Sequence, residues 1–172
     1  TSIGKWSFAS AITNAVNVAD LALGRHAAGQ ASTVTHGYHV GGITIHTGAA
    51  HSVADIQKYA TSTDSDAVSV ADIHTGVTFQ ASCQSATEGY VIGGHAGSPI
   101  SWVGSNQIQK FSLVSDGTGT DVSDLPHIRS EWGGTSSETH GYAHGGYHGG
   151  NRFDDICKYQ FATSNNATDV AS

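Results

Sequence analysis

Basic residues and long apolar stretches are both scarce in this sequence of 172 residues. Lysine and arginine together number 7 against 14 aspartates and glutamates, which leaves a formal charge of −7. A chain with so few cations lacks the positive surface that grips a phosphate backbone, so nucleic acid is excluded as a partner. No apolar run approaches the roughly 18 residues that cross a bilayer, and we expect no membrane insertion.

Cysteine is equally sparse, since only Cys83 and Cys157 occur. Their separation fits no metal-knuckle spacing, and two cysteines are too few for a disulfide scaffold. We favour two packed free thiols over one bridge, and the redox compartment stays open. Because the sequence starts without methionine or a signal-peptide pattern, we expect a fragment or a processed piece.

Glycine, by contrast, is abundant, with 22 residues, while only 12% of the chain is charged and 38% is hydrophobic. Serine and threonine crowd the segments between apolar positions. This composition is typical of an all-β protein with short strands and many turns. The length suits a single domain, because domains commonly run to roughly 100–200 residues.

One motif recurs three times in register, at a spacing of 52 residues. It reads Gly-Tyr-x-x-Gly-Gly and occupies residues 37–42, 89–94 and 141–146. A second motif, Ile-x-Lys followed by an aromatic residue, occurs at residues 3–6, 56–59, 108–111 and 156–159. A third, Val-Ala/Ser-Asp-Leu/Ile, occurs at residues 18–21, 70–73 and 122–125. We expect one repeat domain over residues 1–172, with units at 43–94 and 95–146 and partial units at 1–42 and 147–172.

Alternating apolar residues predict the strands within a unit. Phe111 and Leu113 share one strand face, as do Tyr159 with Phe161 and Trp6 with Phe8, and we expect these side chains in the core. Asp-Gly and Asn-Asn pairs then predict a hairpin between the second and third motifs. With the Ser/Thr-rich segment before each Gly-Tyr, every unit has four short strands. The Gly-Gly pair permits unusual dihedral angles and a close backbone approach.

A strand that ends in Gly-Gly, a variable loop, an aromatic strand and Leu125-Pro126-x-x-Arg129 together resemble the Kelch repeat. The likeness covers nearly the whole chain and implies β-propeller blades. Residues 139–170 are also similar to repeats in predicted virion proteins of marine bacteriophages, including cyanophages. That resemblance implies a tail-fibre or capsid-associated protein, located in a virion or outside the cell.

The number of units conflicts with a closed ring, because closed propellers typically have roughly 4–8 blades. An open array exposes strand edges that pair with other chains. We therefore expect further repeats of a longer chain, or other copies of this chain, as partners. A closed three-unit β-prism or trefoil is the alternative fold.

Function in a repeat protein is expected where the units differ, so the recurring lysines and aspartates are assigned to the shared fold. The segments after each Gly-Gly, at residues 43–55, 95–107 and 147–155, differ in sequence and length. Aromatic and polar side chains in these loops can stack on a sugar ring and hold its hydroxyl groups. The candidate ligand-binding residues are His46, His51, Trp102, Tyr147, His148, Asn151, Arg152 and Phe153.

Eleven histidines raise the question of metal binding, but the tightest cluster, His144 to His148, matches no zinc signature. No nucleophile, base and orienting residue form a recognisable set. We assign no catalytic residues, no metal site and no cofactor. The sequence predicts a non-enzymatic virion appendage whose loops bind a host-surface glycan or protein. The alternatives are a Kelch-like protein-interaction module and a small oxidoreductase on a propeller scaffold. Copper oxidases such as galactose oxidase are the enzymatic precedent among Kelch-like folds, and a redox site of that kind would need Tyr, His and Cys to converge.

Overall fold

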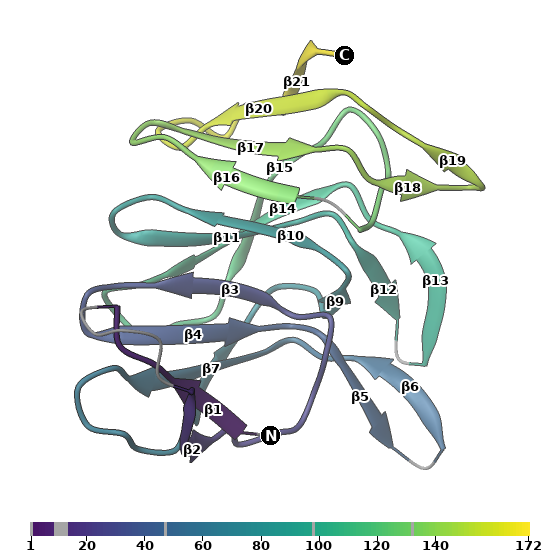
Figure 1. The fold of residues 1–172 in the computed structure, drawn as a ribbon. Helices are drawn as coiled ribbons and strands as arrows, with labels where there is room; N and C mark the ends of the chain where they lie inside the picture. The colour runs from purple at the N-terminus through teal and green to yellow at the C-terminus, as the bar shows by residue number, and fades with distance from the viewer. Residues whose placement is uncertain (1, 9–13, 47, 98, 132) are drawn as a thin grey trace.

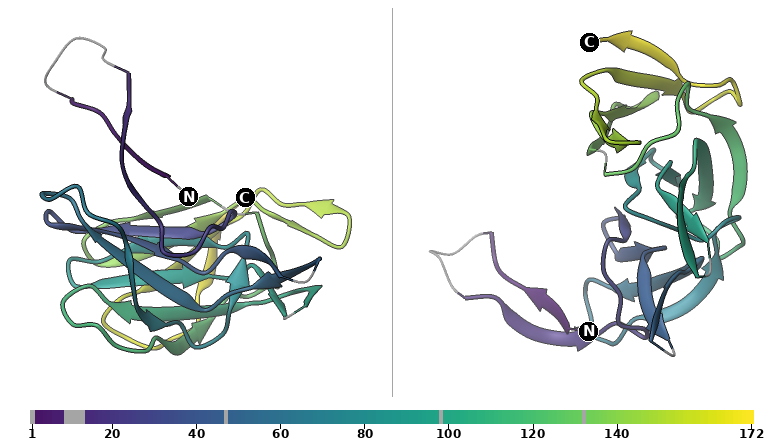
Figure 2. Two further views of the ribbon diagram at one scale, coloured as in Figure 1. Left: turned by 90° about the horizontal axis from the view of Figure 1, so that it is seen from below. Right: turned by 90° about the vertical axis from the view of Figure 1, so that its right-hand side faces the viewer.

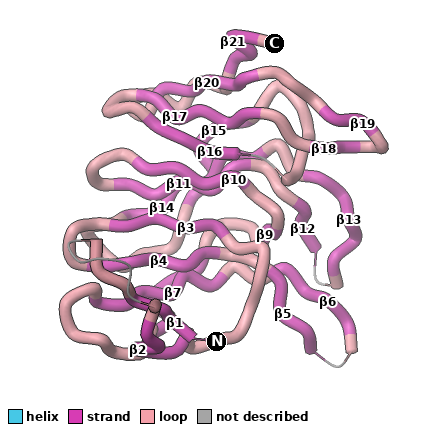
Figure 3. The backbone as a smooth tube through the Cα atoms, in the orientation of Figure 1, coloured by secondary structure: helices cyan, strands magenta, loops and turns pink. Residues whose placement is uncertain are grey.

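The computed structural model describes residues 2–8, 14–46, 48–97, 99–131 and 133–172, and these residues form strands, turns and loops without a helix (Figure 3). Three four-stranded antiparallel sheets dominate the fold. Sheet 1 contains β3 (Gly29–Ser32), β4 (His36–Val40), β7 (Asp55–Ala60) and β8 (Val68–Asp72). Sheet 2 contains β10 (Ala81–Gln84), β11 (Glu88–Ile92), β14 (Gln107–Ser112) and β15 (Thr120–Asp124). Sheet 3 contains β16 (Gly133–Ser136), β17 (His140–His144), β20 (Ile156–Gln160) and β21 (Thr168–Ala171).

Smaller elements complete the fold. An N-terminal ribbon pairs β1 (Ser2–Lys5) with β2 (Val16–Asp20). Three hairpins separate the second strand of each sheet from the third: β5 (Ile43–His46) with β6 (Ala49–Ser52), β12 (His95–Gly97) with β13 (Ile100–Gly104), and β18 (Tyr147–His148) with β19 (Asn151–Arg152). The short strand β9 (Val77–Thr78) pairs with β12. The expectation of plain loops after each Gly-Gly was therefore wrong, because these segments are long enough to pair with themselves.

The sheets lie one above another in a curved, open row, with the N-terminal ribbon at one end and sheet 3 at the other (Figures 1 and 2). The prediction of an all-β chain is confirmed, three of the sheets have four strands each, and the described residues form no closed propeller. Each sheet takes its first two strands from one sequence unit and its last two from the next, so the sheets are offset from the units.

The same irregularity of register marks all four strand pairs of the second and third motifs. The shift follows the recurring isoleucine, between Ile3 and Gly4, Ile56 and Gln57, Ile108 and Gln109, and Ile156 and Cys157. A β-bulge at this place increases the local twist and redirects the side chains that follow. The motif therefore encodes a specific strand geometry as well as a hydrophobic pattern.

The recurring glycine before each tyrosine makes room for an aromatic ring. A Cβ on Gly89 would lie 2.2 Å from the ring of Phe111, and a Cβ on Gly37 would lie equally close to Tyr59. The glycine and the aromatic residue face each other across neighbouring strands. The Gly-Gly pair has the unusual dihedrals that the sequence predicts, for example φ values of 65° and 99° at Gly41 and Gly42.

The core lies between the sheets. One cluster joins sheets 1 and 2, where Tyr38 packs on Phe111 with ring centroids 6.1 Å apart. The other joins sheets 2 and 3, where Tyr90 packs on Tyr159 at 5.5 Å. Phe111 and Tyr159 are buried, as predicted.

The same prediction fails for Trp6 and Phe8, which are 57% and 94% exposed. These residues follow β1, and the N-terminal ribbon has two strands where sheets 1, 2 and 3 have four. Without the strands and the neighbouring sheet that cover their counterparts, the two rings have no core to enter.

Candidate functional site

The three hairpins project from one side of the row of sheets (Figure 1). We call this side the hairpin face, formed by β5–β6, β12–β13 and β18–β19. The first two hairpins contact each other, because the Ser52 hydroxyl donates a hydrogen bond of 2.5 Å to the carbonyl of Gly97. The segments that differ most in sequence are thus gathered on one surface by the parts that recur.

An aromatic cluster made of Phe79, His95 and Trp102 lies at the second hairpin. The ring centroids of His95 and Trp102 are 5.4 Å apart in an edge-on arrangement, and Phe79 lies 6.3 Å from both rings. The indole nevertheless stays 58% exposed. Two ring neighbours hold one side of Trp102 in place, and its remaining surface is open to solvent.

The backbone explains why Trp102 points outwards. In the β12–β13 pairing, Ala96 opposes Val103 and Gly97 opposes Ile100, so Trp102 has no partner in the register. Its φ of 56° lies in the left-handed region, which bulky residues rarely adopt. Such strain is found preferentially at binding and catalytic sites, so it marks this bulge as a candidate site.

A second irregularity recurs at the base of the hairpin face. Ala27, Phe79 and Glu131 are spaced by 52 residues and have positive φ angles of 52°, 54° and 60°. Their backbones form a row across the sheets, because the Phe79 amide donates to Ala27 (3.0 Å) and the Glu131 amide donates to Phe79 (2.7 Å). This row presents a different side chain from each sheet at the same place.

Glu131 lines an open pocket of about 500 Å³ together with Gly146, Tyr147 and Arg152. The backbone of Tyr147 is held by two hydrogen bonds to Ser130, of 2.9 and 3.1 Å. A carboxylate, a guanidinium and a phenol therefore surround one hollow beside the third hairpin. Such groups accept and donate hydrogen bonds to hydroxyl-rich ligands.

His95 connects the aromatic cluster to this pocket. Burial lowers the pKa of His95, although the charge of Glu131 and a backbone hydrogen bond at Trp102 act in the opposite direction. Nearby His148 lowers the pKa further. The imidazole is therefore neutral at pH 7, and its cluster is a weakly polar platform next to a charged pocket.

The structure brings four of the eight sequence-predicted residues to this region: Trp102, Tyr147, His148 and Arg152. Asn151 is exposed in β19 beside Arg152. His46 ends β5 and His51 lies in β6, both on the first hairpin.

Phe153 has a different place, because the guanidinium carbon of Arg129 lies 3.8 Å above its ring. Arg129 is buried and pairs with Asp155. The ring of Phe153 therefore covers a structural ion pair.

Phe79, His95 and Glu131 are not among the binding residues predicted from the sequence. His95 directly follows a Gly-Gly pair, and Phe79 and Glu131 share one position of the 52-residue repeat. The spacing is visible in the sequence, but the positive φ that makes the position special is a property of the backbone.

Both cysteines are free thiols buried between sheets 2 and 3. Cys83 Sγ lies 2.9 Å from the hydroxyl of Tyr159. Burial raises the pKa of each thiol to about 11, so neither is a thiolate at neutral pH. Within the described part of the chain, no group of three or more His, Cys, Asp or Glu side chains is arranged to hold a metal ion.

No protein-family model matches this chain, and no curated protein matches its sequence. The described residues also contain no helix long and apolar enough to span a membrane.

Proposed function

We propose that this chain is a non-enzymatic binding module of a virion appendage, a tail fibre or capsid-associated protein, and that its hairpin face binds host-surface glycans. The sheets are proposed to be Kelch-type propeller blades. That assignment is supported by the four-stranded antiparallel order within each sheet and by the packing of successive sheets face to face. The virion context rests on the resemblance of residues 139–170 to marine bacteriophage repeats.

The observation that carries the glycan proposal is Trp102, whose indole is exposed and packs on two neighbouring rings and whose backbone has a strained conformation. Sugar rings present apolar C–H faces and polar edges. An indole held on one side by His95 and Phe79 offers a stacking surface with little loss of side-chain entropy on binding. Glu131 and Arg152 can then accept and donate hydrogen bonds to the hydroxyl groups.

Binding fits this surface better than catalysis. The pocket at Glu131 is open and sits beside a neutral imidazole, and the two thiols lie in the core with raised pKa values. An open surface with stacking and hydrogen-bonding groups suits many weak contacts, which add up when several modules act together.

Glycan binding is tested by screening the chain against a glycan array and measuring the affinity of hits by calorimetry. We expect Trp102→Ala to weaken binding at least about tenfold, or about 1.4 kcal/mol. Trp6→Ala is the matched control, because it removes another exposed indole far from the hairpin face, and it should leave the affinity unchanged. If no glycan binds, or if both variants bind as well as the natural chain, the glycan assignment is wrong and a protein-interaction module becomes the better hypothesis.

A further inference from the structure

The N-terminal ribbon contacts sheet 1 in the same way as the last two strands of a complete sheet, its outer half, contact the next sheet. Lys5 Nζ pairs with Asp64 at 2.7 Å, and the corresponding Lys58 Nζ pairs with Asp116 at 2.9 Å. The carbonyl of Asp20 accepts from the amide of Ala67 at 2.9 Å. The same bond recurs from Gly119 to Asp72 and from Ala167 to Asp124.

The ribbon nevertheless lacks the first two strands of a complete sheet, which we call its inner half. In the complete sheets, the strand equivalent to β1 pairs on its inner edge with the Gly-Tyr strand: β7 with β4, β14 with β11, and β20 with β17. Among the described residues, β1 pairs only with β2. An unpaired strand edge presents backbone donors and acceptors that readily pair with another strand.

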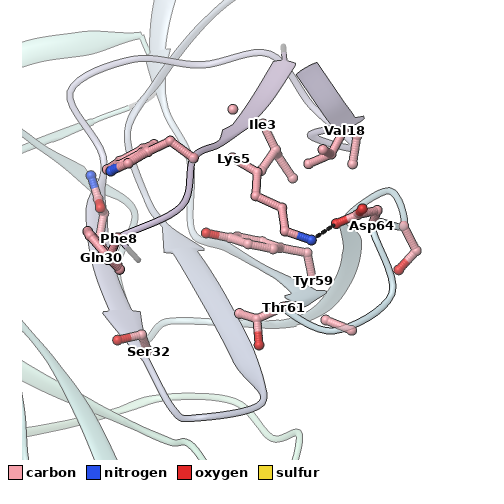
Figure 4. A pocket seen from close by; sticks show the side chains of 14 residues that line it. Ile3, Lys5, Phe8, Val18, Gln30, Ser32, Tyr59, Thr61 and Asp64 are labelled. Atoms are coloured by element: carbon pink, nitrogen blue, oxygen red, sulfur yellow. Dashed lines mark hydrogen bonds and ion pairs between the residues drawn. The ribbon is translucent and has the colours of Figure 1, made fainter. Parts of the chain in front are cut away.

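A pocket of about 620 Å³ lies between the ribbon and the strands β3 and β7 of sheet 1 (Figure 4). Lys5, Tyr59 and Thr61 line it, together with Gln30 and Ser32 of β3. Tyr59 is only half-buried, whereas its counterparts Phe111 and Tyr159 are 3% and 4% exposed. In those sheets a tyrosine of the preceding Gly-Tyr strand covers the ring.

Polar side chains of β3 border the pocket, whereas the corresponding side chains of β10 accept hydrogen bonds from the preceding sheet. Between sheets 1 and 2, the amides of Gln30 and Ser32 donate to the side chains of Ser82 (3.1 Å) and Gln84 (2.7 Å). Gln30 and Ser32 are the residues of β3 that correspond to Ser82 and Gln84, and their side chains border the pocket. They are placed to accept hydrogen bonds from one more inner strand.

We propose that this pocket and the inner edge of β1 bind a β-hairpin from a further unit of the same repeat, outside residues 1–172. Its Gly-Tyr strand pairs with β1, and its tyrosine lies against Tyr59 and under Lys5, as Tyr38 lies against Phe111 and within 5.9 Å of Lys58. The hydroxyl of that tyrosine donates to the carbonyl of Thr61, as Tyr38 does to Leu113 at 3.1 Å.

The hairpin has to come from another unit because the three hairpins of this type among the described residues are already paired. β3–β4, β10–β11 and β16–β17 each belong to a complete sheet. The binding partner therefore has a defined form: an extended strand with small residues, a short turn, and a second strand that carries glycine followed by tyrosine. This inference does not depend on glycan binding.

The direct test uses the whole chain and a fluorescein-labelled peptide with the sequence of residues 29–42, measured by fluorescence anisotropy. We expect saturable binding at one peptide per chain. A Tyr38→Ala peptide should bind at least about tenfold more weakly, because it loses the contact with Tyr59. A His39→Ala peptide is the matched control, because His39 alternates to the opposite face of the strand, and it should bind within about twofold of the parent peptide.

Variants of the chain and hydrogen exchange locate the binding site. Trp6→Ala should weaken peptide binding, because the counterparts of Trp6 cover the glycine of the Gly-Tyr strand, and Trp102→Ala should not. The amides of β1 should exchange more slowly when the peptide is bound. Equal binding of the Tyr38→Ala and parent peptides, or equal effects of the two tryptophan variants, overturns the proposal.

A second measurement covers the case in which the free peptide is too disordered to bind. Residues 29–54 are added directly before Ser2, which reproduces the connection found in sheet 1 because Ser2 corresponds to Asp55. We expect the added hairpin to raise the melting temperature and to bury Trp6, seen as a blue shift of its fluorescence. The same extension with alanine in place of its tyrosine should give a clearly smaller rise. If the melting temperature is unchanged in both, no hairpin of this type fits the pocket.

Discussion

The buried ion pair of Arg129 and Asp155 gives a testable prediction, because sheet 2 has uncharged residues at the two corresponding positions. The Arg129 side chain is 2% exposed and Asp155 is 9% exposed. A second guanidinium hydrogen bond joins them at 2.6 Å, and Arg129 also reaches the carbonyl of Gly145 at 3.3 Å. Arg25 and Asp55 repeat the pair in sheet 1, while sheet 2 has Val77 and Gln107 at the same positions.

Removal of one partner should be costly, whereas removal of both should not. Asp155→Ala leaves a buried guanidinium uncompensated, and we expect a loss of about 3–5 kcal/mol in the free energy of unfolding. The double variant Arg129→Val, Asp155→Gln copies sheet 2. It should recover at least half of that loss, because no buried charge remains.

Equilibrium urea unfolding of the natural chain, both single variants and the double variant gives the coupling energy. Asp55→Ala is the matched variant in sheet 1. It should be similarly costly, because it leaves the Arg25 guanidinium, whose side chain is 0% exposed, without its carboxylate. A loss below about 1 kcal/mol for Asp155→Ala, or a double variant as unstable as the single one, would refute this reasoning.

The remaining predictions concern the glycines, the thiols and two histidines. Gly89→Val should destabilise the chain by more than about 1–3 kcal/mol in urea unfolding, since even a Cβ meets Phe111, while Gly117→Val, with open space around it, should be nearly neutral. Neither thiol should react with Ellman's reagent at pH 8 in the folded chain, and both should react in urea; fast reaction of the folded chain would contradict their burial. Burial lowers the pKa of His39 and of His95. The unfolded chain therefore binds more protons below about pH 6.5, so the melting temperature should fall from pH 7 to pH 5, and less so in His39→Gln.

The recurring parts of the fold could be predicted from the sequence, because they repeat a local pattern. Alternation around Phe111 and the Gly-Tyr motif predict strands whose register the structure shows. Trp6 was misassigned because burial depends on a neighbour, and the same local pattern meets no neighbouring sheet there. The pairing of Arg129 with Asp155 also escaped prediction, because 26 residues and a hairpin separate the two.

The candidate site was predictable only in part. Trp102, Tyr147 and Arg152 could be chosen because they stand in segments that differ between units. The proximity of Tyr147 and Arg152 to Glu131 depends on how the sheets stack, and no spacing in the sequence reports that.

The row of Ala27, Phe79 and Glu131 allows a test of whether a residue is held at a strained position for binding or for the stability of the fold. The left-handed conformation costs a residue other than glycine about 1–2 kcal/mol, yet none of the three positions holds glycine. Glu131→Gly should relieve this strain and keep the amide bond to Phe79. The free energy of unfolding should therefore stay level or rise by up to about 1 kcal/mol, because the gain is partly offset by the greater freedom of glycine in the unfolded chain. Glycan affinity should fall, since the carboxylate leaves the pocket.

Ala27→Gly is the matched control at the same backbone position: urea unfolding should report a similar change in stability, and calorimetry an unchanged affinity. If Glu131→Gly loses stability while Ala27→Gly does not, the glutamate stabilises the fold and is not held at a strained position for binding.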